Sequence, residues 1–276
     1  MSTVPDITLN NGVRMPQLGY GVYLVPPEEA QRSVEQALEA GYRSVDTAAL
    51  YKNEEGVGKA IAASGLPRED VFVTTKVWNS DQGYDPTLRA FDTSMRKLGL
   101  DVLDLYLIHW PLAGSDLFLE TWRALEKLHA DGRVRAIGVS NFQPHHLDRL
   151  AERFSVVPAV NQVELHPYLQ QPEVRRYGTE HSIATESWSP LGRGNGVLND
   201  GVVLELARKY DRTPAQIVLR WHLQLGLVVI PKSVTPSRIK ENFEVFDFEL
   251  TPVDVELMGT LDRGERSGPD PDTFAG

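Results

Sequence analysis

The sequence predicts an α/β fold, a (β/α)8 TIM barrel, from three observations. Short apolar runs alternate with longer segments of helical period along the chain of 276 residues. The runs are rich in Val, Ile and Leu with little polar alternation, which is typical of strands buried on both faces. Eight such units in about 250 residues fit a closed barrel better than an open sheet. The predicted strands are Leu18–Tyr20, Arg43–Val45, Val71–Thr75, Leu103–Ile108, Val134–Val139, Ala159–Asn161, Ile183–Glu186 and Leu227–Ile230.

Segments with the helical spacing of apolar residues fill the gaps between these runs. They carry start and stop signals, such as a proline in the first turn or a glycine after the last apolar residue. The clearest are Glu28–Ala40 before Gly41, the segment between Asp85-Pro86 and Gly99, the segment Leu119–Leu128, and the segment that Thr251-Pro252 opens. Strands that alternate with helices form βαβ units, so the sheet is predicted to be parallel.

Two additions to the barrel are predicted. Residues Ile7–Met15 form an N-terminal β-hairpin around an Asn-Asn-Gly turn. An extra helix lies between strands 7 and 8, at Val203–Tyr210 or at Pro214–Leu225, where Thr213 begins a capping-box pattern. The chain has no linker, low-complexity tract or break in composition, so residues 1–276 are expected to form a single domain.

The composition excludes several classes of function. The chain has no cysteine, which excludes disulfides, iron–sulfur clusters and thiol nucleophiles. The formal net charge is −10, and such a surface repels a phosphate backbone, so nucleic-acid binding is disfavoured. No stretch approaches the roughly 20 apolar residues that cross a bilayer, and Met1–Met15 lacks the pattern of a signal peptide. We therefore expect a cytoplasmic protein without nucleic-acid or membrane partners.

Ionisable residues follow three consecutive predicted strands. Asp46 follows the second strand, Lys76 the third and His109 the fourth. Tyr51 lies five residues beyond Asp46, just before a predicted helix N-cap at Asn53. Active sites of parallel barrels lie at the C-terminal ends of the strands, so these groups are expected to meet there.

These four groups suit the reduction of a carbonyl by hydride, which leaves an alkoxide that needs a proton. A free tyrosine has a pKa of about 10, and a nearby lysine cation lowers it. Asp46 can hold Lys76 charged, and His109 can donate a hydrogen bond to the carbonyl oxygen. Taken singly, each residue has an ordinary explanation as a helix cap, a packing group or an ion-pair partner. Four complementary groups on adjacent strand ends favour a catalytic site.

Six motifs resemble those of the aldo-keto reductase superfamily, in the family's order and over essentially the whole chain. They are Gly41–Ala48 with Tyr51–Glu54, Thr75–Trp78, Leu103–Pro111, Ile137–Phe142, Asn161–Pro167 and Ile230–Val234. The resemblance implies NADPH-dependent reduction of small aldehydes and ketones to alcohols by direct hydride transfer. It also implies a catalytic tetrad of Asp46, Tyr51, Lys76 and His109, with Tyr51 as the general acid, and a monomeric enzyme.

Part of the cofactor site is predicted from the residues themselves. No Gly-x-Gly-x-x-Gly follows a strand, so the dinucleotide-binding fold is not indicated, and the glycine-rich segment 192–196 is best explained as a flexible loop. Barrels bind phosphate near the loops after strands 7 and 8. Beyond the eighth strand, Lys232, Ser233 and Arg238 offer two cations and a hydroxyl beside a helix N-terminus, which suits a ribose 2′-phosphate. Together with the resemblance, this predicts NADPH in preference to NADH.

The resemblance implies the other cofactor contacts. Ser140, Asn141 and Gln162 would hold the nicotinamide carboxamide, and Trp188 would stack on the ring. The contacts with the rest of the cofactor would come from Ser189, Leu191 and Gly192 at the pyrophosphate, Glu241 and Asn242 at the adenine, and Ile230 and Val234 beside Lys232 and Ser233. Trp188 departs from the tyrosine of most of the family and is similar to the bacterial 2,5-diketo-gluconate reductase branch.

Three aromatic residues are predicted to form the substrate pocket. Tyr23, Trp78 and Trp110 lie just past the first, third and fourth strands, and aromatic walls around a few polar groups are typical of a small-ligand site. Short loops and a brief hydrophilic tail predict an open pocket with quick NADPH exchange. Keto-sugars, dicarbonyls such as methylglyoxal, and aromatic aldehydes all suit it. His145 and His146 are adjacent and are expected to point apart on a helix, so no metal is expected.

Two other interpretations stay open at this point. Lys76 could form a Schiff base, as in a barrel aldolase, with Asp46 and Tyr51 as proton shuttles. Alternatively, the protein could bind NADPH as a regulatory subunit with negligible turnover. The first leaves Lys232 and Arg238 unexplained, and the intact tetrad argues against the second.

Overall fold

The computed structural model describes residues 4–276, so the first three residues of Met1–Met15 lie outside the described part. In that part, eight parallel strands form one sheet in the order β10-β9-β8-β7-β6-β5-β4-β3, as predicted. The strands are β3 (Tyr20–Gly21), β4 (Ser44–Asp46), β5 (Phe72–Val77), β6 (Leu103–Ile108), β7 (Val134–Ser140), β8 (Val160–Glu164), β9 (Ala184–Trp188) and β10 (Val228–Val229).

The sheet closes into a barrel where its first and last strands meet. Leu18 and Val229 form a parallel bridge. The amide of Gly19 donates to the carbonyl of Val229 over 2.9 Å, and the amide of Val229 donates to the carbonyl of Gln17 over 3.0 Å. The predicted barrel, which removes both sheet edges, is therefore confirmed.

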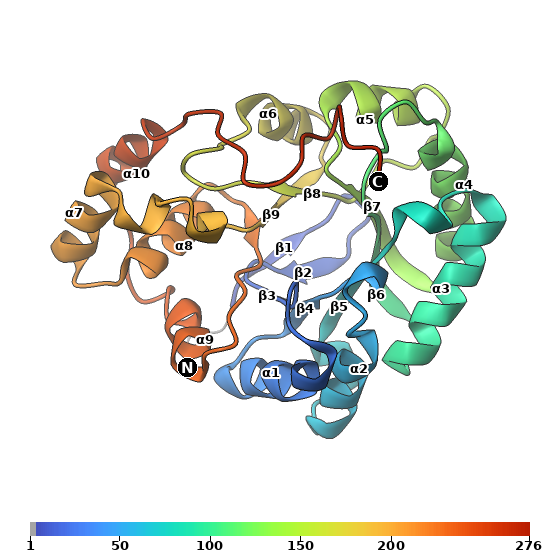
Figure 1. Cartoon of the computed structure of the whole chain (residues 1–276), viewed down its shortest axis with the longest axis horizontal. Helices are drawn as coiled ribbons and strands as arrows, with labels where there is room; N and C mark the ends of the chain where they lie inside the picture. Colours follow the sequence, from blue (N-terminus) through green and yellow to red (C-terminus); the bar gives the residue numbers. More distant parts are fainter. Residues whose placement is uncertain (1–3) are drawn as a thin grey trace.

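Helices surround the barrel (Figure 1). They are α1 (Pro27–Ala40), α2 (Glu54–Ala63), α3 (Tyr84–Leu98), α4 (Leu117–Ala130), α5 (Pro144–Ala151), α6 (Pro172–Glu180), α7 (Gly201–Tyr210), α8 (Pro214–Gln224), α9 (Pro236–Phe243) and α10 (Pro252–Gly259). Both alternatives for the extra helix between strands 7 and 8 form, as α7 and α8. The capping box of α8 is present, since Thr213 and Gln216 each accept a hydrogen bond from the other's amide.

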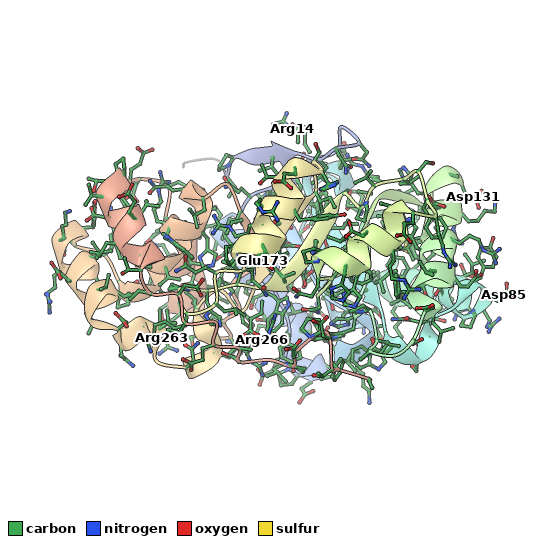
Figure 2. All side chains as sticks on the ribbon, turned by 90° about the horizontal axis from the view of Figure 1, so that it is seen from above. Arg14, Asp85, Asp131, Glu173, Arg263 and Arg266 are labelled. Carbon is green, nitrogen blue, oxygen red and sulfur yellow. The ribbon has the colours of Figure 1, made fainter. Side chains whose placement is uncertain are left out.

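The predicted N-terminal hairpin is formed by β1 (Asp6–Thr8) and β2 (Arg14–Pro16). Its Met15 is fully buried in an apolar cluster with Phe72 of β5 and Leu105 of β6. The hairpin therefore closes the N-terminal end of the barrel. Figure 2 shows Arg14 of the hairpin and Arg266 near the C-terminus on opposite sides of the molecule.

Residues 262–276, here called the C-terminal segment, follow α10 and run toward α5 (Figure 1). The amides of Ser267 and Gly268 donate to the two carboxylate oxygens of Glu164 over 2.7 and 3.0 Å. Nearer the end, the amide of Ala113 donates to the carbonyl of Phe274 over 2.9 Å. The segment is thus fixed at both sides of the barrel mouth.

Within residues 4–276, no helix combines the length and the apolar character needed to span a membrane.

Candidate active site

A cavity of about 450 Å³ opens at the C-terminal ends of the strands. Tyr23, Trp78 and Trp110, the three residues predicted for the substrate pocket, all line it. Pro269 and Phe274 of the C-terminal segment line it as well, and the Phe274 ring packs on Trp110 with 4.6 Å between the ring centroids. The C-terminal segment therefore narrows the open pocket that the short loops led us to expect.

Asp46 and Lys76 form a buried ion pair on the neighbouring strands β4 and β5. Lys76 Nζ lies 2.6 Å from Asp46 Oδ1 and donates to the carbonyl of Thr47 over 2.9 Å. Burial by itself lowers the pKa of Lys76, but Asp46, Tyr51 and Glu186 together outweigh it, so that the pKa is raised. Lys76 is therefore charged at neutral pH, which disfavours the Schiff-base interpretation because that chemistry needs a neutral amine.

Tyr51 ends a short 3-10 helix (Ala49–Tyr51) after β4. The turn is held by Asn53, whose amide donates to the carbonyls of Val22 and Val25 over 3.0 and 3.1 Å. Asn53 occupies the predicted N-cap position of α2, although its side chain makes no capping hydrogen bond. This turn places the Tyr51 ring in the cavity wall, with its centroid 5.3 Å from Lys76 Nζ.

The pKa of Tyr51 differs from the value that the sequence suggests. Burial raises it to about 12, and the charge of Lys76 lowers it only in part. We expected the lysine to bring this pKa below 10, which is wrong for the protein without its ligands, because desolvation of the phenolate outweighs one cation. Tyr51 therefore keeps its proton at every pH near neutrality.

His109 follows β6 and lies between two aromatic rings. Its ring packs edge-on against Tyr51, at 5.8 Å between centroids, and against Trp78, at 5.0 Å. Burial, and then the charge of Lys76, hold the pKa of His109 well below its usual range. The imidazole is therefore neutral and carries one N–H, which it can donate to a ligand in the cavity.

The adjoining part of the cavity wall contains the residues predicted for the nicotinamide. Ser140, Asn141, Gln162 and Trp188 all line it. Asn141 has a left-handed backbone, with φ of 65°, and its Nδ2 donates to the carbonyl of His109 over 3.0 Å. Its Oδ1 accepts from Trp188 Nε1 over 2.8 Å, which fixes the plane of the indole.

The other predicted cofactor residues extend from this wall toward α9. Ser189, Leu191, Ile230 and Lys232 line the cavity, and Gly192 is buried directly after Leu191. Ser233 and Val234 follow Lys232 along the chain. Three more of the predicted residues lie on α9: Arg238 is exposed and Asn242 is buried. The third, Glu241, accepts a hydrogen bond from Thr213 Oγ1. The structure thus brings the tetrad together with the residues predicted for the nicotinamide. It places those predicted for the 2′-phosphate and the adenine in one continuous segment that begins at Lys232 in the cavity wall.

Comparison with known proteins agrees with this geometry. Residues 17–263 match the model of the aldo/keto reductase family. The chain is 56% identical over 270 residues to an aldo-keto reductase of Mycolicibacterium smegmatis, covering 98% of each chain. It is 52% identical over 277 residues to methylglyoxal reductase DkgA of Escherichia coli (strain K12), covering 100% of each. A solved structure of a Gox0644 mutant in complex with NADPH is 50% identical, with a TM-score of 0.95 and 99% of each chain covered.

The chain belongs to the aldo/keto reductase family. It is therefore an NADP-dependent oxidoreductase that acts on carbonyl compounds, with NADPH as its cofactor. The family that the six motifs implied and the branch that Trp188 implied are both confirmed.

The structure of this reductase also contains site residues that the sequence reasoning missed. Glu186 on β9 is fully buried beneath the cavity, and its Oε2 accepts from Gln162 Nε2 over 2.8 Å. Because side chains alternate along a strand, an inward Trp188 predicts an inward Glu186, and this signal was available. Arg193 lines the cavity with its guanidinium carbon 5.3 Å from the Tyr23 ring centroid. The segment 192–196, expected as a flexible loop, contains the 3-10 turn Gly192–Gly194, and a second turn, Val197–Asn199, follows it directly.

His145 and His146 do not point apart as expected. Their ring centroids lie 4.0 Å apart, and both Nε2 atoms face Asp272 of the C-terminal segment, at 3.3 and 3.9 Å from its Oδ1. This is the first turn of α5, where the two side chains lean toward the same carboxylate. His146 Nδ1 accepts from the amide of Gln143 over 3.1 Å, so the neutral ring carries its proton on Nε2. A proton on Nε2 leaves that atom no lone pair for a metal, which disfavours metal ligation by these three residues.

Proposed function

We propose that this reductase converts small aldehydes and ketones to alcohols by direct hydride transfer from NADPH, with Tyr51 as the general acid. The observation that carries the proposal is that one cavity holds the phenol of Tyr51 beside a charged Lys76 and a neutral His109. These groups suit a carbonyl oxygen that becomes an alkoxide.

The residues of the adjoining wall fit a nicotinamide nucleotide. Ser140 and Asn141 offer a hydroxyl and an amide, and the indole of Trp188 offers a flat surface that its hydrogen bond to Asn141 fixes in place. Gln162 Nε2 donates to the carboxyl groups of Asp46 and Glu186, which leaves its Oε1 to accept from a carboxamide. When bound, NADPH supplies the hydride that adds to the carbonyl carbon.

The tetrad residues act on the carbonyl oxygen. Neutral His109 donates a hydrogen bond to it and so polarises the carbonyl and fixes its direction. Tyr51 transfers its proton to the oxygen as negative charge develops there. Lys76, held charged by Asp46, stabilises the phenolate that Tyr51 becomes. A phenol with a pKa of about 12 is still a much stronger acid than an alcohol, whose pKa is near that of bulk water, about 15.7, so the transfer is downhill.

The cavity supports a set of small substrates. Its walls are the aromatic rings of Tyr23, Trp78, Trp110 and Phe274, and its volume of about 450 Å³ suits compact molecules. The E. coli relative is named a methylglyoxal reductase. We therefore propose dicarbonyls such as methylglyoxal first, with keto-sugars and aromatic aldehydes as further candidates. We also propose, from the family resemblance, that the enzyme acts as a monomer; sedimentation velocity of the active enzyme tests this.

The test is NADPH oxidation with a panel of these substrates, with Tyr51→Phe beside the wild-type protein. Wild-type turnover is expected, and Tyr51→Phe should lose about 100- to 10,000-fold in kcat, the range for a general acid. NADPH binding, measured by fluorescence, should be unchanged, because the variant keeps the ring. Undiminished turnover by Tyr51→Phe contradicts the assignment of the general acid. Tight NADPH binding without turnover on the whole panel favours the regulatory interpretation.

A further inference from the structure

A buried carboxyl group lies directly beneath the tetrad. Glu186 is paired in register with Gln162 of β8 and is inaccessible to solvent. Barrel interiors are filled mainly by branched apolar side chains, and the adjacent strand β10 follows this rule with Val228 opposite Glu186. A carboxyl group at this depth therefore calls for a physical explanation.

Glu186 and Asp46 share one amide group. Gln162 Nε2 donates to Glu186 Oε2 and to Asp46 Oδ2, each over 2.8 Å. Both protons of this amide are thereby used, which fixes the orientation of the Gln162 side chain. Within residues 4–276, Glu186 Oε1 has no hydrogen-bond partner.

The charges in this layer do not balance if both carboxyl groups are ionised. Asp46 is paired with Lys76 of β5. The positive charge of Lys76 also lowers the pKa of Glu186, but it is the smallest of the effects on that group. Ionised Glu186 would leave a net negative charge out of contact with water, which is costly. Burial, and then the charge of Asp46, raise the pKa of Glu186 to about 8. The geometry and the charges agree that Glu186 is the protonated member of the pair at neutral pH.

We propose that Glu186 is a positioning residue of the reductase, whose neutral carboxyl group orients Gln162 and whose ionisation weakens Tyr51 as an acid. This inference rests on the proposed function. An added negative charge beneath Asp46 and Lys76 opposes both the formation of a phenolate at Tyr51 and the developing alkoxide beside it. Carbonyl reduction should therefore slow as the pH rises through the ionisation of Glu186.

The protonation of Glu186 can be measured without any turnover. Infrared spectra of the wild-type protein minus Glu186→Gln should show the C=O stretch of one protonated carboxyl at pH 6. The band should disappear on titration with a midpoint near pH 8. Absence of this band at pH 6 overturns the proposal, whether or not the protein reduces carbonyl compounds. Failure of the substrate panel, in contrast, counts against the proposed function and leaves this test in force.

The effect on the reaction is read from the pH profile of kcat. If ionised Glu186 shifts the effective acidity of Tyr51 by about one pKa unit, the wild-type kcat falls up to about tenfold between pH 7 and pH 9. Glu186→Gln keeps the size of the side chain and an acceptor for Gln162, and it should lose this decline. The matched control is Glu54→Gln, also fully buried but outside the barrel, where Glu54 accepts from Thr75 Oγ1 over 2.7 Å. It should keep the wild-type profile.

A second variant separates the two parts of the role. Glu186→Leu restores an apolar interior and removes the acceptor of Gln162, so it should lose the pH decline and also raise the KM for NADPH several-fold. A merely structural role would change stability and leave the shape of the pH profile unaltered. Profiles of Glu186→Gln and Glu186→Leu that superimpose on that of the wild-type protein therefore overturn the proposal.

Discussion

The two halves of the barrel interior differ sharply in chemistry although the same strands build them. Toward the hairpin, the interior is apolar, with Phe72 of β5, Leu105 of β6 and Val160 of β8. Lys76 lies four residues beyond Phe72 on β5, and Gln162 lies two residues beyond Val160 on β8; both are buried. The apolar half stabilises the fold, and the polar half is retained at a cost in stability because the chemistry needs it.

The largest expected effect comes from breaking the ion pair of the polar half. Lys76→Met leaves Asp46 as an unpaired buried charge, which typically costs about 3–5 kcal/mol in the free energy of unfolding. The kcat for carbonyl reduction should fall at least about 100-fold, because Tyr51 loses the cation that stabilises its phenolate. Urea unfolding and steady-state kinetics measure the two effects.

The double variant Lys76→Met with Asp46→Leu sharpens the comparison. Replacing both members of a buried ion pair by apolar residues is often neutral or stabilising, so much of the lost stability should return. Activity should not return. Recovery of kcat in the double variant would show that the ion pair serves the fold and not the reaction.

A change in the apolar half should have the opposite signature. Leu105→Ala removes a fully buried side chain and should lower the free energy of unfolding by about 2–5 kcal/mol. Below the unfolding transition, kcat should stay within about twofold of wild type, a difference of less than about 0.5 kcal/mol in the activation barrier. A large loss of kcat in a folded Leu105→Ala protein would contradict the separation of the two halves.

A smaller effect is expected at the distal end of the cofactor segment. We propose that Arg238 binds the ribose 2′-phosphate. Arg238→Ala would then remove one charge-assisted hydrogen bond, worth about 1.5–3 kcal/mol, so the Kd for NADPH should rise roughly 10- to 150-fold. The Kd for NADH should hardly change. Lys240→Ala, a loss of the same charge from an exposed position of the same helix, is the control and should affect neither cofactor. Equal losses for NADPH and NADH would remove Arg238 from the 2′-phosphate site.

The pH dependence of the free energy of unfolding tests the polar half without any substrate or cofactor. Between pH 4.5 and about 8, folded Glu186 holds a proton that the unfolded chain has lost, so the free energy of unfolding falls as the pH rises. The slope from this residue is up to about 1.4 kcal/mol per pH unit. Glu186→Gln should lack this slope and should be more stable than wild type at pH 8. Parallel curves for the two proteins would show that Glu186 is ionised when folded.

The same division explains what the sequence could predict. The eight strands were found because their apolar runs are unmistakable, and the helices because prolines and glycines mark their ends. The predicted strands Val71–Thr75, Ala159–Asn161 and Ile183–Glu186 stopped short, whereas β5, β8 and β9 continue to Val77, Glu164 and Trp188. Lys76 and Gln162 are polar residues that point into the barrel. Because buried strands are recognised by their apolar residues, a polar residue in the sequence was interpreted as the end of the strand.

Other features depended on contacts that no local pattern records. The tail composition is hydrophilic, so the packing of Phe274 on Trp110 was not foreseen. The pKa of Tyr51 depends on how completely its surroundings exclude water, and spacing along the chain does not contain that information. Asp46, Tyr51, Lys76 and His109 were found from the residues themselves, because the carboxyl ends of adjacent strands necessarily meet at one rim.

The closure of the barrel has a consequence for its slow motions. β3 and β10, the strands that meet there, have two residues each, and the bonds that join them include the amides of Gly19, Gly21 and Val229. Few bonds must break for this junction to open, so these amides should exchange with deuterium well before those in the centre of β6 and β7. Lys232 follows the junction directly. If Lys232 binds the phosphate end of the nucleotide, as we propose, transient opening of this junction would loosen that end first, while the rest of the sheet stays intact.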